Sequence, residues 1–411
     1  MDHVIIGPGP AGITAAETLR QYDPEGSILL LGDEPEPPYS RMAIPYLLSR
    51  HIEESGTWLR DPERHYVERG VELQRARVER VDAAAHRLYL DDGNSRSYDR
   101  LLVATGSRPA VPPIPGVDLP GVHACWTLAD ARALMRLTQA DSDVVLIGAG
   151  FIGCIILEAL QARGVRLVVV EQGRRMVPRM MNDKAGGLIR AWCEQKGVRV
   201  HTGTGVNSIQ ADGDHLAVHL TDGTTLPAAT VITATGVRPN TSLLEGSGVD
   251  VAAGIVVDRH MRSSVADIYA AGDVAEGVDF STGGNSVQAV QPTAVDHGRI
   301  AALNMAGRDV AFTGGLNMNV LDTLGLISSS FGLWMGVDGG DNAELYAPDD
   351  FRYINLQFED DRLVGASAVG LTEHVGVLRG LIQGRCRLGK WRQRLMADPT
   401  RIMETYLATC Q

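Results

Sequence analysis

A glycine-rich turn between an apolar strand and a helix occurs twice in this chain, and no other feature limits its possible folds as strongly. The first copy begins with the apolar residues 3–7 (HVIIG), continues through the turn 7–12 (GPGPAG), and enters a helical stretch that reaches about residue 22. A second apolar stretch, residues 27–31, leads to Glu34. Strand, GxGxxG turn, helix, strand and acid are together typical of a unit that binds a dinucleotide, with the pyrophosphate at the helix N-terminus.

The second copy has the same order of elements. An apolar strand, residues 144–147, leads to the turn 148–153 (GAGFIG), a helix to about residue 162, and a strand, residues 166–170, that ends at Glu171. Each copy is followed by a similar strand and turn, LLVATGSRP (101–109) and VITATGVRPN (231–240). An offset of this size indicates a duplicated domain rather than a solenoid. Two such units predict two bound dinucleotides, one of them a flavin.

Composition excludes several other classes of protein. A chain of 411 residues has room for two or three domains. Its net charge of −12 argues against nonspecific binding to nucleic acid or to an anionic membrane. The longest apolar run, Val144 to Leu157, is too short to span a bilayer, and the first residues lack the basic region of a signal peptide. We therefore expect a cytoplasmic protein without a membrane span.

The cysteines and histidines do not have the spacing of a metal site. The five cysteines, at positions 125, 154, 193, 386 and 410, include no CxxC or CxxxxC pair. This pattern favours reduced, mostly structural thiols over a disulfide framework or a metal cluster. The histidines form no HExxH spacing, so we predict no metal site.

In these motifs the chain resembles the flavoproteins of the pyridine nucleotide–disulfide oxidoreductase superfamily, which have two dinucleotide-binding domains. The matching elements are GPGPAG with Glu34, PYSR (38–41), ATGSRP, GAGFIG with Glu171, ATGVRPN and AAGD (270–273). The resemblance is strong over about residues 1–310 and weak beyond. It implies an α/β fold with two Rossmann-like domains, one inserted in the other, and a C-terminal α+β interface domain.

The same resemblance implies domain bounds and an assembly. The FAD-binding domain would comprise residues 1–110 and 245–315, and the NAD(P)H-binding domain residues 111–244. Residues 316–411 would form the interface domain, which this family commonly uses for dimerisation. We therefore expect a homodimer or a subunit of a complex.

The resemblance also implies which residues bind the cofactors, FAD and NAD(H), with NADP(H) less favoured. The glycines of the first turn would face the FAD pyrophosphate, Glu34 the adenosine ribose, and Asp273 the ribityl chain and phosphate. A helix over 292–306, opened by Gln291, would point its N-terminus at the flavin pyrimidine edge. The expected cofactor-binding residues are Gly7, Gly9, Pro10, Ala11, Gly12, Glu34, Arg41, Thr105, Gly106, Gly148, Gly150, Phe151, Ile152, Gly153, Glu171, Gly236, Gly272, Asp273, Pro292 and Thr293. No catalytic side chain is assigned.

The segment after PYSR decides which branch of the superfamily the chain resembles. Thiol-dependent relatives carry a cysteine just after this turn, where Met42 stands here. The chain is therefore most similar to the rubredoxin and ferredoxin reductase and NADH-dependent nitrite reductase-like branch, in which a bare flavin passes electrons on. Relatives in that branch usually have a lysine near the flavin, and Tyr46 occupies its place.

Three functions are compatible with these residues. The first is a flavin-dependent oxidoreductase that takes hydride from NADH and passes electrons to a ferredoxin- or rubredoxin-like protein or to a small acceptor. The second is a flavoprotein subunit with structural or sensing FAD and weak reactivity toward nicotinamide. The third, a thiol-dependent disulfide reductase or NADH oxidase, is disfavoured by the positions of the cysteines.

The nicotinamide end of the second unit departs from the family pattern. Members commonly show GxGxIGxE, whose glutamate lies near the nicotinamide, whereas this chain has Ile155. Glu158 lies one turn further along the same helix face. We expect altered or slower hydride transfer, with loss of nicotinamide binding as the alternative. Glu171 favours NADH because a carboxylate repels a 2′-phosphate, although Arg174 and Arg175 follow closely and could attract one.

The C-terminal region reverses the local charge. The basic residues between positions 379 and 401 are Arg379, Arg385, Arg387, Lys390, Arg392, Arg394 and Arg401, against the acid Asp398. One interpretation is a solvated helical face that pairs with the chain's own acidic surface. The other is a docking patch for a small acidic iron–sulfur electron carrier, because opposite charge steers such encounters over about one Debye length, roughly 8 Å at physiological salt.

Overall fold

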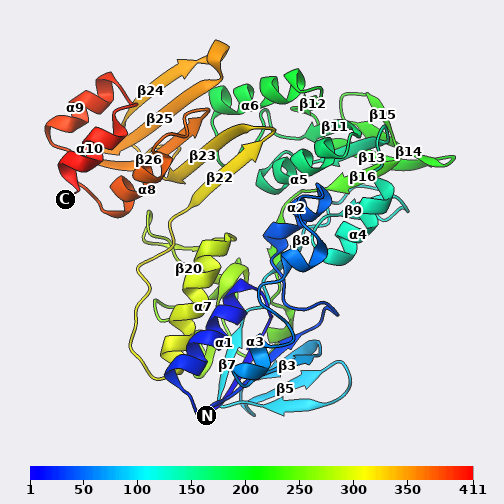
Figure 1. Cartoon of the computed structure of the whole chain (residues 1–411), viewed down its shortest axis with the longest axis vertical. Helices are drawn as coiled ribbons and strands as arrows, with labels where there is room; N and C mark the ends of the chain where they lie inside the picture. The colour runs from blue at the N-terminus through cyan, green and yellow to red at the C-terminus, as the bar shows by residue number, and fades with distance from the viewer. Residues whose placement is uncertain (411) are drawn as a thin grey trace. The chain divides into compact units, whose positions relative to one another are not determined.

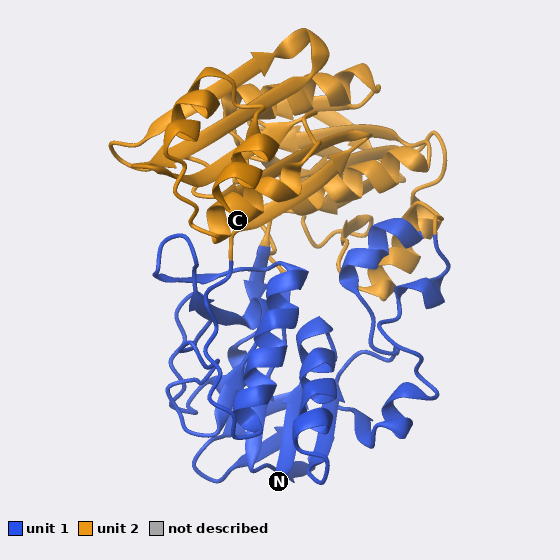
Figure 2. Cartoon of the chain, turned by 60° about the vertical axis from the view of Figure 1, so that its left-hand side comes forward, with its two compact units in different colours: residues 1–47, 52–108, 237–315 blue, residues 48–51, 109–236, 316–411 orange. Residues whose placement is uncertain are grey.

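The computed structural model describes residues 1–410, which fall into two compact units (Figure 2). Unit 1 comprises Met1–Leu47, Ile52–Arg108 and Val237–Gly315. Unit 2 comprises Leu48–His51, Pro109–Gly236 and the chain from Leu316 onward. The chain therefore leaves unit 1 after the first ATG motif and returns to it just after the second.

Unit 1 is built on a parallel sheet in the order β19-β7-β1-β2-β3. The strands are β1 (Asp2–Ile6), β2 (Ser27–Gly32), β3 (Val71–Arg75), β7 (Arg100–Val103) and β19 (Ile268–Ala270). Helices α1 (Pro10–Tyr22) and α7 (Gln291–Met305) lie side by side (Figure 1). Their approach needs Gly298, since a Cβ there would lie 2.2 Å from the carbonyl oxygen of Ala11. Buried strands of this kind carry continuous apolar runs, as ILLL in β2 does.

Smaller elements complete unit 1. An antiparallel sheet contains β4 (Val78–Asp82), β5 (Arg87–Leu90) and β6 (Ser95–Ser97), and another sheet contains β18 (Ile255–Val256), β20 (Ala275–Val278) and β21 (Asn285–Val287). Strand β8 (Ser107–Pro109) pairs with β17 (Val237–Pro239). The short helices are η1 (Arg41–Ala43), α2 (Ile44–Leu48), η2 (Glu54–Thr57), α3 (His65–Glu68), η3 (Ser242–Leu244) and η4 (Gly272–Val274).

Unit 2 contains a second parallel sheet, in the order β12-β11-β10-β16-β9. Its strands are β9 (Val122–Ala124), β10 (Asp143–Ile147), β11 (Arg166–Glu171), β12 (Arg199–Thr202) and β16 (Thr230–Thr233). Its helices are α4 (Leu128–Leu137), α5 (Phe151–Ala162) and α6 (Asp183–Gln195). A three-stranded antiparallel sheet of β13 (Val206–Asp212), β14 (His215–Leu220) and β15 (Thr225–Ala228) packs against it.

The C-terminal part of unit 2 is an antiparallel sheet with three helices. The sheet has the order β22-β23-β26-β25-β24, from β22 (Met318–Thr323), β23 (Leu326–Gly332), β24 (Asp341–Ala347), β25 (Arg352–Glu359) and β26 (Arg362–Val369). The helices are α8 (Val375–Gln383), α9 (Lys390–Ala397) and α10 (Ile402–Thr409), with η5 (Pro348–Asp350) between β24 and β25. Helix α5 contacts β22, and the Trp192 indole on α6 donates to the Leu324 carbonyl at 3.1 Å. The sheet therefore packs on the second parallel domain.

The cysteine prediction is wrong for one pair. Cys386 and Cys410 form a disulfide with their Cα atoms 5.6 Å apart, whereas Cys125, Cys154 and Cys193 are free and buried. The sequence did not indicate the bond because the two cysteines meet only when α10 packs on α8. The α/β class and the strands and helices expected around both glycine turns are confirmed. Among residues 1–410 no helix has the length and apolar content needed to cross a bilayer.

Candidate functional site

The first glycine turn joins β1 to α1 at the carboxyl end of the unit 1 sheet. Gly7 has a φ of +110°, and a Cβ there would lie 2.1 Å from the carbonyl oxygen of Ala104. A Cβ on Gly12 would lie 2.0 Å from the carbonyl oxygen of Gly7. In contrast, no atom lies within 4 Å of a Cβ built on Gly9, the N-cap of α1, and no side chain caps the helix. Uncapped amides at a helix N-terminus beside open space are suited to a pyrophosphate.

The segments that follow β7 and β19 lie next to this turn. A Cβ on Gly7 would also lie 3.1 Å from the amide nitrogen of Thr105. Gly106 has a φ of +64° and faces open space. Gly272 has a φ of +79°, and a Cβ there would be 3.3 Å from the Cβ of Ala11. The fold thus brings the GPGPAG, ATGSRP and AAGD motifs together at one end of the sheet, as the rule for ligand sites in parallel sheets expects.

Asp273 is a half-buried acid that Ser107 holds in place. The Ser107 hydroxyl donates to the Oδ2 atom of Asp273 at 2.8 Å. Burial raises the pKa of Asp273, while the Ser107 hydrogen bond and the charge of Arg41 act in the opposite direction. Sequence reasoning missed Ser107, although it directly follows two expected site residues.

Glu34 is held by two side chains of the PYSR motif. The Tyr39 hydroxyl donates to Oε2 of Glu34 at 2.5 Å, and the Arg41 guanidinium donates to Oε1 at 2.6 Å. The Ser40 hydroxyl donates to Oε1 of Gln291 at 2.9 Å. This contact connects the PYSR segment to the start of α7, where the expected residues Pro292 and Thr293 form the first helical turn.

The second turn joins β10 to α5 with a similar backbone. Gly148 has a φ of +103°, and its Cβ would lie 2.5 Å from the carbonyl oxygen of Ala234. A Cβ on Gly153 would lie 2.1 Å from the carbonyl oxygen of Gly148. Gly150 is the N-cap of α5 and faces open space, as does Gly236 at a φ of +111°. The expected residues Phe151 and Ile152 begin α5 and are half-buried.

Glu171 is bound by backbone amides. Its Oε2 atom accepts from the amide of Ala149 and its Oε1 atom from the amide of Gly173, each at 2.7 Å. Arg175 is engaged within its own loop: it donates to the carbonyls of Met181 and Pro178 and pairs with Asp183 at 2.7 Å. Exposed Arg174 has no partner within residues 1–410. Of the two arginines, only Arg174 is free to meet a 2′-phosphate.

Relatives commonly carry an acid where this chain has Ile155, and Glu158 is the acid on the same helix. That side chain is half-buried on α5. Burial, followed by the nearby charge of Asp322, raises the pKa of Glu158. Ile155 itself is half-buried on α5. The helix therefore presents an apolar side chain at residue 155 and a partly shielded acid at Glu158.

The free thiols are unsuited to nucleophilic chemistry. Burial raises the pKa of Cys125 and of Cys193 to about 12, and it raises the pKa of Cys154 well above its ordinary value. Only a thiolate attacks a disulfide or stacks reactively beside a flavin. These cysteines therefore pack the interior. Met42 and Tyr46, which stand at the family's reactive positions, are 45% and 60% exposed.

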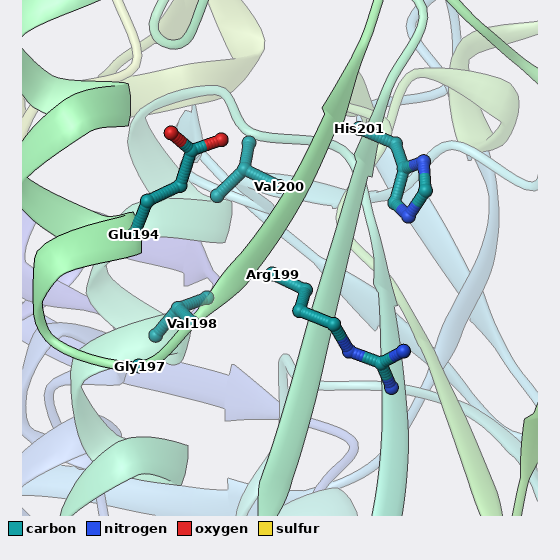
Figure 3. A pocket seen from close by; sticks show the side chains of 6 residues that line it. All are labelled: Glu194, Gly197, Val198, Arg199, Val200 and His201. Carbon is teal, nitrogen blue, oxygen red and sulfur yellow. The ribbon is translucent and has the colours of Figure 1, made fainter.

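An open depression of about 420 Å³ lies elsewhere, at the end of α6 and along β12 (Figure 3). Its lining residues are Glu194, Gly197, Val198, Arg199, Val200 and His201. No residue of either glycine turn contributes to it, so we assign it no cofactor.

The donors and spaces at the two turns fit two dinucleotides. Each turn combines a glycine that faces open space, an uncapped helix N-terminus and a carboxylate at the end of the second strand or just beyond it. The first turn has in addition the hydrogen-bonded Asp273–Ser107 pair and the start of α7, which the second does not reproduce in sequence. This difference fits a larger cofactor, FAD, at the first turn.

Similarity to known proteins agrees with this geometry. The family model for pyridine nucleotide-disulphide oxidoreductases matches residues 1–298. The chain is 30% identical over 400 residues to the NADH-dependent phenylglyoxylate dehydrogenase subunit epsilon of Aromatoleum evansii, covering 97% of this chain and 95% of that subunit. It is 36% identical over 312 residues to rhodocoxin reductase of Rhodococcus erythropolis, covering 75% of this chain and 72% of that protein.

Among solved structures, a ferredoxin reductase from Rhodopseudomonas palustris superposes with a TM-score of 0.84 at 29% identity, covering 91% of this chain and 92% of that one. The chain therefore belongs to the pyridine nucleotide–disulphide oxidoreductase family, as an enzyme that uses FAD and a nicotinamide dinucleotide.

Proposed function

We propose that this chain takes hydride from NADH and delivers the electrons, through FAD, to a small acidic iron–sulfur protein. When bound, FAD supplies two-electron acceptance and one-electron release. The observation that carries the proposal is the pair of glycine turns with matching geometry, combined with free thiols that are all buried. Two dinucleotide sites without a reactive thiol leave the flavin as the group that passes electrons on.

Several residues have roles in this proposal. Amides at the start of α1 hold the FAD pyrophosphate, Glu34 accepts from the adenosine ribose, and Asp273 accepts from the ribityl chain. The N-terminus of α7 would face the pyrimidine edge of a bound flavin, where its dipole would favour an anionic reduced ring. Amides at the start of α5 hold the NADH pyrophosphate.

Cosubstrate choice rests on Glu171. Its carboxylate is fixed by the amides of Ala149 and Gly173, so it faces an incoming ribose without rearrangement. A fixed carboxylate accepts hydrogen bonds from both ribose hydroxyls and repels a 2′-phosphate. We propose NADH as the hydride donor.

The proposed docking surface includes only some of the basic residues between positions 379 and 401. Arg392 pairs with Asp341, and Arg401 pairs with Asp398 at 3.4 Å. Arg387 and Lys390 are exposed and have no partner within residues 1–410, and exposed Arg394 lies 4.3 Å from the ring of Trp391. Exposed Arg379 donates to the side-chain oxygen of Gln383 at 2.7 Å. We propose Arg387, Lys390 and Arg394, which we call the docking set, as the charges that meet a partner.

A charge-removal experiment tests the acceptor. The triple variant Arg387→Gln, Lys390→Gln, Arg394→Gln is compared with wild type for NADH-driven reduction of an acidic [2Fe–2S] ferredoxin. We expect slower reduction, most strongly at low salt, because steering charges act on the association rate. Reduction of the bound flavin by NADH should be unchanged. Arg401→Gln is the matched control, because its charge is already paired with Asp398. Equal rates for the triple variant and wild type at every salt concentration would refute the docking set.

A second candidate is an electron-transfer subunit of a larger enzyme. The match to a dehydrogenase subunit over 97% of this chain and 95% of that subunit favours it. Purified chain that reduces an artificial acceptor but no ferredoxin would support this candidate over the first. We further propose a cytoplasmic location, a homodimer or complex, and the domain bounds 1–110 with 245–315, 111–244 and 316–411.

A further inference from the structure

Asn240 uses its backbone and its side chain to hold the turn that follows β7. Its side-chain amide donates to the carbonyl of Thr105 at 2.9 Å, and its own carbonyl accepts from the Thr105 hydroxyl at 2.8 Å. Its backbone amide donates to the carbonyl of Gly106 at 3.0 Å. Its Oδ1 atom accepts from the Arg108 guanidinium at 2.9 Å. The two segments are 135 residues apart in sequence, so this contact is made only by the fold.

The turn that Asn240 holds lies beside the first glycine turn. The carbonyl of Ala104 is so close to Gly7 that a Cβ there would approach it to 2.1 Å, and the amide of Thr105 follows. Gly106 faces open space, and Ser107 donates to the half-buried carboxyl of Asp273. A shift of this turn would therefore move the backbone at Gly106 and the hydrogen bond that orients Asp273 at the same time.

We propose that Asn240 is a positioning residue for FAD: it fixes the turn 105–108 so that the backbone of Gly106 and the carboxyl of Asp273 keep the placement that the cofactor requires. The inference rests on the proposed assignment of FAD to the first turn. Asparagine suits the role because its side chain offers a donor to one carbonyl and an acceptor to a guanidinium. Alanine would remove both contacts and leave the Thr105 carbonyl without its partner.

Asn304 provides a matched control. It is a buried asparagine of the same unit, and its side-chain amide donates to the carbonyls of Ile300 and Val310, each at 2.8 Å. Its Oδ1 atom accepts from the amide of Val310 at 3.2 Å. These contacts hold the end of α7, whereas the proposed cofactor contact is at its start. Asn304→Ala should therefore report the stability lost by removing a structural asparagine.

The test measures FAD binding by apoprotein together with the thermal midpoints of the apo and FAD-loaded forms. For Asn240→Ala we expect FAD binding to weaken by about tenfold or more, so that the cofactor raises the midpoint by less than in wild type. The visible spectrum of FAD at saturation should also change, because the ribityl contact moves. For Asn304→Ala we expect both midpoints to fall, with FAD affinity within about twofold of wild type.

The outcomes separate the inference from the proposed function. If wild type binds FAD and Asn240→Ala binds it equally well with an unchanged spectrum, Asn240 has no positioning role. If wild type binds no FAD, the proposed function fails as well. Should Asn240→Ala not fold, Thr105→Val removes one of the same hydrogen bonds, and unchanged FAD affinity in that variant overturns the inference.

Discussion

The two glycine turns share a backbone geometry but hold their acids in different ways. The φ angles of Gly7 and Gly148 are +110° and +103°. A Cβ on Gly12 or Gly153 would lie 2.0 Å or 2.1 Å from the carbonyl oxygen of the first glycine of its own turn. In both turns that first glycine donates its amide to the neighbouring strand at 2.8 Å.

The register of these hydrogen bonds shows where the acids differ. Gly7 donates to Leu31 and Gly148 donates to Val170. The residues that follow these acceptors are Gly32 and Glu171, so a glycine in the first unit occupies the place of the acid in the second. In the first unit the acids come one and two residues later, at Asp33 and Glu34, and Glu34 is the one assigned to the ribose.

Residue 8 explains the displacement. In the second unit Ala149 donates its backbone amide to Glu171 at 2.7 Å. Its counterpart in the first unit is Pro8, which has no N–H to donate. The proline ring also fills the space, because a Cβ on Gly32 would lie 2.7 Å from the Cγ atom of Pro8. The identity of one turn residue thus decides whether the acid is fixed by the backbone or, like Glu34, by side chains.

The largest expected effect separates the first glycine of each turn, Gly7 or Gly148, from the N-cap glycine, Gly9 or Gly150. Gly7→Ala and Gly148→Ala should each lower the free energy of unfolding by about 3 kcal/mol or more, because the new Cβ meets backbone at a positive φ. Gly9→Ala and Gly150→Ala should keep the fold and weaken only the binding of FAD and NADH respectively, because these positions face open space. Denaturant unfolding and cofactor titration measure the two effects. Equal stability losses for the first glycine and the N-cap glycine would show that backbone crowding does not distinguish the two positions.

The next effect distinguishes the two acids. Glu171→Gln weakens charge-assisted bonds from two amides and should lower stability by about 1–2 kcal/mol. The same variant should lower the ratio of kcat/KM for NADH to kcat/KM for NADPH. Glu34→Gln should lower stability by less than about 1 kcal/mol, because Glu34 is paired with the partly exposed side chain of Arg41. Unfolding curves with steady-state assays on both nucleotides measure this contrast, and a larger stability loss for Glu34→Gln would reverse our account.

A double-mutant cycle tests whether Pro8 and Gly32 are coupled. Gly32→Glu alone should be destabilising, because its Cβ would meet the Pro8 ring. With Pro8→Ala present, residue 8 regains an N–H and room for an acid, so the double variant should recover about 1 kcal/mol relative to additivity. Chemical denaturation of the apoproteins measures the coupling. Strict additivity would mean that residue 8 does not control the position of the acid.

The smallest effect concerns Asp273, a half-buried acid beside the first glycine turn. Because burial raises its pKa in the folded state above the ordinary value of 3.8, the folded apoprotein binds the extra proton and is favoured at low pH. This contribution is lost as pH rises from 3.8 through the raised pKa. Asp273→Asn should therefore flatten the pH dependence of apoprotein stability over this window. An unchanged profile would indicate that Asp273 titrates normally.

Local sequence predicted the elements of both units well, because their signals are short-range. The first helix was expected to reach residue 22 and does, and the helix expected over 292–306 is found at Gln291–Met305. Glycine spacing likewise identified the turns, since a positive φ and a close carbonyl leave no alternative residue at Gly7 or Gly148.

Contacts between distant segments could not be predicted in this way. Three contacts depend on how distant segments of the chain pack together. They are the hydrogen bond from Asn240 to Thr105, the hydrogen bond from Ser107 to Asp273, and the disulfide between Cys386 and Cys410. Pro8 is a local signal of a different kind. Because it has no N–H, it cannot donate to an acid as the amide of Ala149 donates to Glu171.

The central claim is that a bare flavin at the first turn receives hydride from NADH held at the second. The most direct test is anaerobic mixing of FAD-loaded protein with NADH or NADPH while the flavin absorbance is followed. The protein is compared with a variant in which Cys125, Cys154 and Cys193 are serine, after bound FAD has been verified in both. We predict full bleaching by NADH in both proteins, with a lower half-saturating concentration than NADPH. Flavin that stays oxidised in the presence of NADH, or bleaching that requires the thiols, would contradict the claim.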